Sequence, residues 1–313
     1  MARQPRLHIP GGFYHAILRG NGGQAIFHDN ADRSKFFLLL QEGTERFRFR
    51  LHGFCLMSNH VHLLIQAGDI SLSRIMQNLS FRYTQYINKK TKRAGHLFQG
   101  RYKAILIDAD NYLLELVRYI HNNPVRANMV EDALKYLWSS YSSYMGLQTT
   151  PFLTTSWVLG QFAGTESAAR RRFAEFIERG AGEGHRQDLY SGANDSRILG
   201  NDMFVERVLL RRTTARKPHL DAIVTHICKK SGITEKELSA PSRQRNFAVL
   251  RGIIGWLARH FESASLSDVA KRFNRDPATI SRAVRNIEER RFESKELQER
   301  IENSRKYFYY KMQ

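Results

Sequence analysis

The sequence has few cysteines, no long apolar run and few acidic residues relative to basic ones. Its only cysteines, Cys55 and Cys228, lie too far apart to suggest a disulfide framework, and a reducing cytoplasm fits this usage. No apolar stretch approaches the roughly 18 residues that a membrane-spanning helix needs. The basic segment 1–18 lacks a continuous apolar core and a small-residue cleavage site, so we expect no signal peptide there. These absences favour a cytoplasmic protein without a membrane partner.

Positive charge, in contrast, is abundant. The 313 residues include 49 Lys and Arg against 30 Asp and Glu, which gives a formal net charge of +19 and a pI near 10.1. A surface of this kind attracts polyanions, and nucleic acid is the first candidate. The length suits about two domains, each able to bury its own core.

Residues 1–150 alternate strand-like and helix-like patterns. We expect the order strand, helix, strand, strand, helix, strand and a further helix, which is the split ferredoxin-like arrangement. The fold class is therefore α+β, with helices expected to cover one face of a sheet. The expected elements are a strand at 13–20, a helix at 31–48, two strands within 49–66 joined near 57–59, a helix at 71–91, a strand at 101–108 and a helix at 111–123 that Pro124 ends.

The pattern changes twice beyond residue 150. Residues 151–202 are polar and include a Gly-rich stretch at 180–197, which predicts a connector. Residues 203–313 have helical periodicity and carry 24 Lys and Arg against 13 Asp and Glu. We therefore expect a first domain at 1–150, a connector at 151–202 and a basic helical domain at 203–313.

Two histidines, His60 and His62, are separated by one residue in SNHVHLLI. On a strand such residues share a face about 6.5 to 7 Å apart, so both imidazoles can bind one divalent ion. Val61 and Leu63 then point the other way, into the core. An isolated pair of this kind is more often an ordinary feature of a half-exposed strand. A metal site therefore requires a third ligand and a nucleophile.

The segment LVRYIHNNPV offers both, because Tyr119 and Asn123 are four residues apart and face the same side of a helix. A phenol can attack phosphorus, and a divalent cation, Mg or Mn, can polarise a phosphodiester. The expected ligands of that ion are His60, His62 and Asn123. The alternatives are a buried tyrosine that bonds to an amide or to the backbone, and Tyr112 as a rival nucleophile.

A resemblance to the HUH single-tyrosine transposases, in particular the REP-associated tyrosine transposases, is carried by GFYHAILRGN, GFCLMSNHVHLLI, LFQGRYKAILI and YIHNNPVRANMV. It covers about the first 145 residues, in matching order and spacing. The resemblance implies that His60 and His62 are the HUH pair, and it makes Tyr119 the nucleophile and Asn123 an additional metal ligand. It also implies DNA transposition and recombination on hairpin-forming single-stranded DNA, through a 5′-phosphotyrosine and a free 3′-hydroxyl.

Further side chains near these motifs are candidate contacts for single-stranded DNA. Arg19 and Asn21 flank Gly20 at the end of the first expected strand, where a glycine permits close approach. A basic and aromatic stretch before LFQGRYK can stack on bases and follow the backbone. Each cation taken alone is more often simply solvated, so only the group is persuasive. The candidates in and after this stretch are Arg82, Lys89, Lys90 and Arg101.

Residues 265–290 have the pattern of two short helices around a turn, with Asp276 as a cap and Pro277 beginning the second helix. The segment is similar to the C-terminal helix-turn-helix domain of the replication initiator DnaA, which implies sequence-specific binding to duplex DNA. An ordinary helical bundle is the alternative. The candidate DNA contacts on the second helix are Thr279, Ser281, Arg282 and Arg285.

Together these patterns predict a metal-dependent single-strand endonuclease and strand transferase joined to a module that binds duplex DNA. One alternative is a DNA-binding regulator without catalysis. Another is a metallohydrolase that uses an activated water in place of tyrosine. With one nucleophilic tyrosine per chain, either a monomer or a homodimer is compatible with the chemistry.

Overall fold

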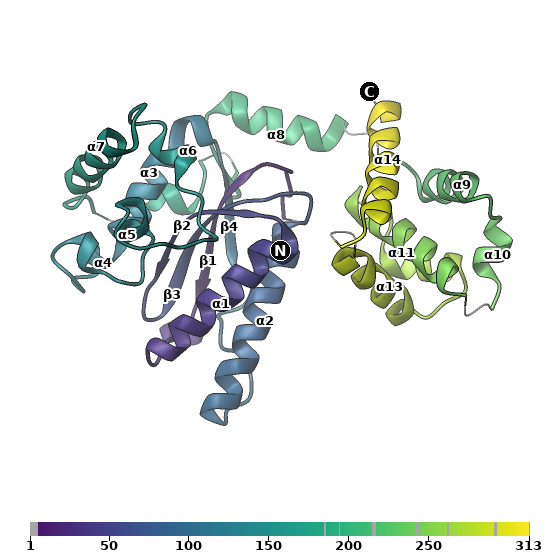
Figure 1. Ribbon diagram of the computed structural model, residues 1–313, viewed down its shortest axis with the longest axis horizontal. Coiled ribbons are helices and arrows are strands. Elements are labelled where there is room, and N and C mark those ends of the chain that lie inside the picture. Colours follow the sequence, from purple (N-terminus) through teal and green to yellow (C-terminus); the bar gives the residue numbers. More distant parts are fainter. Residues whose placement is uncertain are drawn as a thin grey trace. The chain divides into compact units, whose positions relative to one another are not determined.

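The computed structural model describes residues 6–184, 186–193, 195–214, 217–241, 244–261, 263–290 and 293–312 (Figure 1). The chain divides into two compact units, Met1–Val208 and Leu209–Gln313. The first is an α+β unit and the second is helical, as expected. Residues 1–5 belong to the segment 1–18, in which we expect no signal peptide, and lie outside the described residues. Within the described residues, no helix combines the length and apolarity required to cross a membrane.

The first unit is built on a sheet with the strand order β2-β3-β1-β4-β5. β1 (Phe13–Arg19) is antiparallel to both β3 (His60–Gln66) and β4 (Lys103–Ile107), and β2 (Arg50–Leu56) is antiparallel to β3. These four strands have the ferredoxin-like order. β5 (Ile198–Leu199) extends the sheet parallel to β4.

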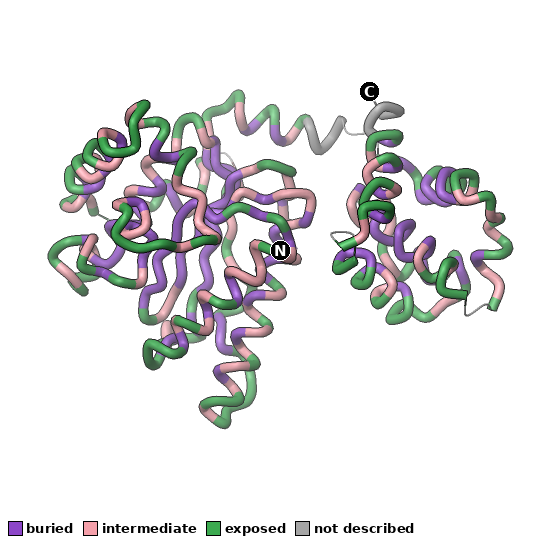
Figure 2. The backbone as a smooth tube through the Cα atoms, viewed as in Figure 1, coloured by how far each residue is buried: buried purple, intermediate pink, exposed green. Residues whose placement is uncertain are grey.

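Helices cover both faces of this sheet. α1 (Asn30–Phe47) and α2 (Leu72–Thr91) pack against each other on one face, and α3 (Ala109–His121) packs against β2 and β3 on the other (Figure 1). Both alternating sets of side chains in β1 and β3 are accordingly buried, and Figure 2 shows the strands as mostly buried. The expectation that helices cover only one face is therefore wrong.

The expected elements of the first 123 residues begin and end within two residues of the observed ones. α1 starts where the Asp29 carboxylate accepts a hydrogen bond from the Asp32 amide at 3.0 Å. α3 ends at His121, and Pro124 lies in the first turn of a new short helix. The remaining elements of the unit are η1 (Asn21–Gly23), α4 (Asn123–Arg126), η2 (Ala133–Lys135), α5 (Tyr141–Tyr144), α6 (Ser156–Leu159), α7 (Glu166–Arg179) and η3 (Gln187–Tyr190).

The segment expected to be a connector at 151–202 is instead part of the first unit. Its apolar side chains enter the core cluster on the α3 face, and Phe173 stacks on Tyr144 with ring centroids 4.7 Å apart. The unit boundary falls inside α8 (Asp202–Thr214). The segment looks like a linker because its few apolar anchors are separated by polar residues. These anchors include Val158, Phe173, Ile177, Leu189 and Leu199.

The second unit is built on α11 (Arg245–His260) and α13 (Pro277–Arg290), which pack closely. A Cβ on Gly252 would lie 2.9 Å from the carbonyl oxygen of Ala283, so only glycine permits this approach. The expected pair of short helices is present, and the Asp276 carboxylate accepts from the Ala278 amide at 2.7 Å. The other helices are α9 (Leu220–Ser231), α10 (Glu235–Ser239), α12 (Leu266–Arg272) and α14 (Lys295–Met312).

Candidate active site

Three histidines lie together on the face of the sheet that α3 covers. Strand alternation puts His60 and His62 on the same side of β3, and His15 of β1 lies beside them. The ring centroids of His60 and His62 are 4.9 Å apart, and those of His15 and His62 are 5.1 Å apart. The pair expected from the sequence therefore shares one face, together with a third histidine that the sequence did not single out.

Hydrogen bonds determine which nitrogen of His62 carries the lone pair. The Nδ1 of His15 lies 3.0 Å from the carbonyl oxygen of Leu189, which only accepts, so this Nδ1 donates. Burial lowers the pKa of His15 to about 4, so its ring is neutral near pH 7. Its Nε2 then accepts from the Nδ1 of His62 at 2.8 Å. In a neutral His62 ring the lone pair is therefore on Nε2.

A neighbouring residue, Asn59, orients the His60 ring so that its Nδ1 also donates a hydrogen bond. Its Nδ1 lies 2.7 Å from the amide oxygen of Asn59, whose amide nitrogen donates to the Gly23 carbonyl at 3.1 Å. This second bond fixes the amide so that its oxygen faces His60, and the lone pair of His60 is again on Nε2. Burial, aided by the charge of Arg19, lowers the pKa of His60 to about 4.

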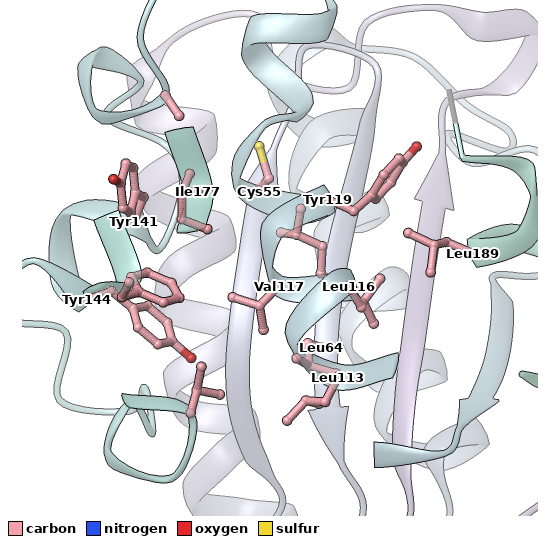
Figure 3. Packing of buried hydrophobic residues seen from close by; sticks show 14 of the residues in the cluster. Cys55, Leu64, Leu113, Leu116, Val117, Tyr119, Tyr141, Tyr144, Ile177 and Leu189 are labelled. Carbon is pink, nitrogen blue, oxygen red and sulfur yellow. The ribbon is translucent and has the colours of Figure 1, made fainter. Parts of the chain in front are cut away.

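Tyr119 lies in the last turn of α3, and Leu113, Leu116 and Val117 anchor this helix to the sheet (Figure 3). In Figure 3 the hydroxyl points away from these anchors. The side chain is only 2% exposed, and its hydroxyl donates to the hydroxyl of Tyr190 at 2.7 Å. The ring centroid lies 5.9 Å from that of His62.

Asn123 and Arg126 follow Tyr119 on the next turn of chain. The amide nitrogen of Asn123 donates to the carbonyl of Tyr119 at 3.1 Å, which leaves its amide oxygen as an acceptor. The Arg126 guanidinium donates to the same carbonyl at 2.6 Å, and its central carbon lies 3.8 Å from the centre of the Tyr119 ring. A cation therefore lies against the face of the phenol.

A cavity of about 850 Å³ lies beside these groups, and His62, which is completely buried, is not among its lining residues. Its walls bring together the sequence-predicted His60, Tyr119 and Asn123. Tyr112, the rival nucleophile, instead packs against the apolar core cluster of α3. The cationic side chains on the cavity wall are Arg19, Lys103 and Arg126.

The donor atoms available for a metal ion are the Nε2 atoms of His60 and His62 and the amide oxygen of Asn123. Both imidazoles have the second nitrogen held by a neighbour, which is the usual support of a metal-binding histidine. Among the described residues, no three or more His, Cys, Asp or Glu side chains form a metal cluster. An ion in this cavity would therefore use amide, water or substrate oxygens for its further ligands.

The remaining predicted contacts of the first unit are dispersed. Asn21 is exposed in η1, and Lys89 is exposed on α2. Arg82 forms an ion pair with Glu42 at 2.5 Å. Arg101 lines a separate cavity of about 580 Å³. Arg19 alone of these cations lies on the wall that contains Tyr119.

Lys90 is also engaged within the fold. Its ammonium lies 2.6 Å from the Asp29 carboxylate and 2.5 Å from that of Asp32, which is fully buried. These contacts raise the pKa of Lys90 above its ordinary value and tie α2 to the start of α1. A structural role therefore accounts for Lys90 without DNA.

Sequence reasoning missed His15, Lys103, Arg126 and Tyr190. His15 and Arg126 lie inside motifs that carry the transposase resemblance, so the signal was present but gave no role. Lys103 lies in LFQGRYKAILI, two residues beyond Arg101. Tyr190 lies in the polar segment interpreted as a connector, and nothing local indicates that its hydroxyl meets Tyr119.

The side of α13 expected to contact DNA is exposed in the second unit. On α13, Ile280, Val284 and Ile287 are buried, so the opposite side faces solvent. Within the described residues, no ion pair involves Arg282 or Arg285. The candidates there are Thr279, Arg282 and Arg285, which are exposed, and Ser281, which is half-buried.

Known protein families match a segment of each unit. Residues 10–123 match the family model described as "Transposase IS200 like", and residues 220–287 match "Bacterial dnaA protein helix-turn-helix". Both resemblances expected from the sequence are confirmed. The IS200-like segment supports a transposase-type nuclease in the first unit, and the DnaA-like segment supports DNA binding through a helix-turn-helix in the second.

Individual relatives cover parts of the chain. The chromosomal replication initiator protein DnaA of Oleidesulfovibrio alaskensis is 38% identical over 69 residues, which is 22% of this chain and 15% of that protein. A solved structure described as the REP-associated tyrosine transposase bound to a REP hairpin aligns with a TM-score of 0.42 and 14% identity. That alignment covers 49% of this chain and 98% of the other.

Proposed function

We propose that this chain is a metal-dependent endonuclease and strand transferase that cuts and rejoins hairpin-forming single-stranded DNA, with Tyr119 as the nucleophile. The observation that carries the proposal is that Tyr119, His60 and Asn123 line one cavity. Cationic side chains line the same cavity, and His62 lies beside the phenol ring. The DnaA-like unit binds duplex DNA in this proposal and brings the nuclease to its site.

The cavity is suited to a phosphodiester. Arg19, Lys103 and Arg126 provide fixed positive charge on its wall, and charge-assisted hydrogen bonds to phosphate oxygens are among the stronger ones. Glu183 is the acidic residue on the same wall, so cations are in excess there. These contacts place phosphorus near the phenol without reading the base sequence.

Tyr119 then attacks phosphorus, and the bond between phosphorus and the 3′ oxygen breaks. The phenol loses its proton, and the departing 3′ oxygen gains one, so the products are a 5′-phosphotyrosine and a free 3′-hydroxyl. Tyr190 accepts the hydrogen bond of Tyr119 and fixes the direction of the phenolic oxygen. Attack of a 3′-hydroxyl on the phosphotyrosine reverses the step and rejoins the strand.

His60, His62 and Asn123 would hold the divalent ion, which we propose to be Mg or Mn. Bound there, it would polarise the scissile phosphate and offset its developing charge. With two imidazoles and one amide from the protein, water or phosphate oxygens would supply the further ligands of the ion. A chelator is therefore expected to abolish cleavage, and either ion should restore it.

Denaturing electrophoresis with hairpin DNA labelled at its 3′ end, which stays on the fragment joined to tyrosine, tests the proposal. The wild-type chain is expected to give a labelled protein band in the presence of Mg or Mn. Tyr119→Phe should lose this band while retaining DNA binding in a mobility-shift assay. The control Tyr112→Phe removes a hydroxyl from the same helix and should keep the band.

The other outcomes identify the alternatives. A released product without a covalent band would indicate hydrolysis by an activated water. Binding without cleavage by the wild type would indicate a regulator. A covalent band that persists in Tyr119→Phe would place the nucleophile on another residue.

A further inference from the structure

We infer that His15 is a positioning residue that sets the tautomer of His62, so that Nε2 of His62 is the atom presented to the metal. The inference rests on the proposed function, because it assigns His15 a role through a metal ligand. Neither His15 nor His62 lines the cavity, and His15 acts through its hydrogen bond to His62.

Three groups form a buried chain of hydrogen bonds. The Leu189 carbonyl accepts from Nδ1 of His15, and Nε2 of His15 accepts from Nδ1 of His62, at 3.0 and 2.8 Å. Both histidine side chains are completely buried, so water does not replace either bond. A carbonyl oxygen has no proton to donate, so Nδ1 of His15 is the donor, and the completely buried, neutral ring leaves Nε2 as the acceptor.

The direction of the chain matters because a neutral imidazole has only one lone pair for a metal. If the proton of His62 moved to Nε2, that atom could no longer act as a ligand. Nearby groups that accept from the second nitrogen are the usual means of fixing this choice. His15 supplies such an acceptor at the centre of the sheet.

The two proposed imidazole ligands are supported in different ways. His60 relies on Asn59, its neighbour in sequence. His62 relies on His15 of β1 and, through it, on Leu189 of η3. The tautomer of His62 thus requires η3 to be docked on the sheet, and removal of His15 should affect metal binding rather than the strand pairing.

Two substitutions at His15 separate the polar role from the space-filling role. His15→Phe keeps a flat buried ring but offers His62 no acceptor. His15→Gln keeps an acceptor oxygen toward His62, and its amide nitrogen can donate to the Leu189 carbonyl. His52→Phe is the matched control, because His52 is a buried histidine of β2 bonded to Thr154 and Gln66.

The first measurement is Mn²⁺ binding to the full chain without DNA, followed by the electron paramagnetic resonance of free Mn²⁺. His15→Phe is expected to lower the affinity by about 10- to 100-fold, the usual effect of losing a partner behind a metal ligand. His15→Gln should stay within a few-fold of the wild type, as should His52→Phe.

The second measurement reports the tautomer itself in the metal-free protein. Long-range proton and nitrogen correlation spectra distinguish a protonated ring nitrogen from one with a lone pair. The signal of His62, assigned by its loss in His62→Gln, is expected to show the proton on Nδ1 in the wild type and His15→Gln. In His15→Phe we expect that preference to be lost.

These readouts separate this inference from the proposed function. A His62 proton on Nε2 in the wild type, or unchanged Mn²⁺ binding in folded His15→Phe, would overturn the role of His15 even if the DNA adduct forms. Conversely, an absent adduct with the predicted tautomer would count against the nuclease alone. If His15→Phe does not fold, the wild-type tautomer and His15→Gln still decide.

Discussion

At the scale of single residues, one short turn supports both halves of the candidate site. η3 offers the Leu189 carbonyl to His15 and the Tyr190 hydroxyl to Tyr119. The first contact is buried and the second is partly buried, and an unsatisfied buried polar group costs about 1 to 3 kcal/mol. The proposed ligand His62 and the proposed nucleophile therefore depend on neighbouring residues of one segment that is distant from both in sequence.

Tyr190→Phe tests this dependence at the nucleophile. The change removes the acceptor of the Tyr119 hydroxyl and leaves the ring in place, so the phenol loses its fixed direction. We expect the single-turnover rate of adduct formation to fall about tenfold, equivalent to about 1.4 kcal/mol, with hairpin affinity unchanged.

A matched tyrosine away from this cavity serves as the control. Tyr102→Phe removes a hydroxyl that bonds to Ser73 beside the separate 580 Å³ cavity, and the adduct rate should not change. A Tyr190→Phe chain as fast as the wild type would show that the contact between the two hydroxyls does not assist the reaction.

At the scale of elements, the second unit depends on close contact between α11 and α13. A Cβ at Gly252 would lie 2.8 Å from a side-chain carbon of Ile287 and 2.9 Å from the Ala283 carbonyl oxygen. The backbone cannot move aside as a flexible side chain can. Overpacking by an added methyl group is expected to cost about 1 to 3 kcal/mol. This cost outweighs the gain of up to about 1 kcal/mol in helix propensity when alanine replaces glycine.

Gly252→Ala is therefore expected to destabilise the second unit. Hydrogen exchange in the full chain should accelerate about tenfold at α11 and α13 amides and stay unchanged in the first unit. Asn246→Ala, an exposed change on the same helix, is the control. Slower exchange in Gly252→Ala would mean that propensity exceeds packing at this contact.

The elements that the sequence predicted well have a clear composition or spacing. β1 and β3 are rich in apolar residues, the Asp29 cap begins α1, and α2 has buried apolar residues at helical spacing. His60 and His62 followed directly, because alternation on a strand fixes a shared face. Tyr119 and Asn123 were expected on one helix, but α3 ends at His121 and Asn123 begins α4, although both residues line the cavity.

The parts that could not be predicted depend on long-range contacts. In segment 151–202, apolar anchors such as Phe173 are isolated among polar residues, so the local pattern matches a linker and only the docked structure reveals a second covered face. Tyr190 and Leu189 meet partners 71 and 174 residues away. Lys90 appeared available for DNA because the buried carboxylate of Asp32 that holds it is 58 residues distant.

At the scale of the whole molecule, the proposed function is divided between the two units. The proposed chemistry lies wholly within Met1–Val208, and the helix-turn-helix lies within Leu209–Gln313. Each unit has its own apolar core. Changes on the exposed face of α13 are therefore expected to alter where the enzyme acts without altering how Tyr119 reacts.

The paired change Arg282→Ala and Arg285→Ala tests this division. Both guanidinium groups leave the exposed face of α13, while the buried face remains intact. Duplex binding should weaken, and if both contact phosphates the slope of log affinity against log salt should fall by about 2, since each contact contributes about 0.9. Adduct formation on a short hairpin should match the wild type, because no group in the cavity changes.

A control with the same loss of charge shows whether duplex binding depends on the exposed face of α13 or on the net positive charge of the unit. Lys229→Ala and Lys230→Ala remove two exposed cations from α9 of the same unit. If this pair weakens duplex binding as strongly as the α13 pair, net charge dominates and α13 has no special role. If only the α13 pair does so, that helix makes the contacts, and a contact with a base would add a loss of sequence preference to the loss of affinity.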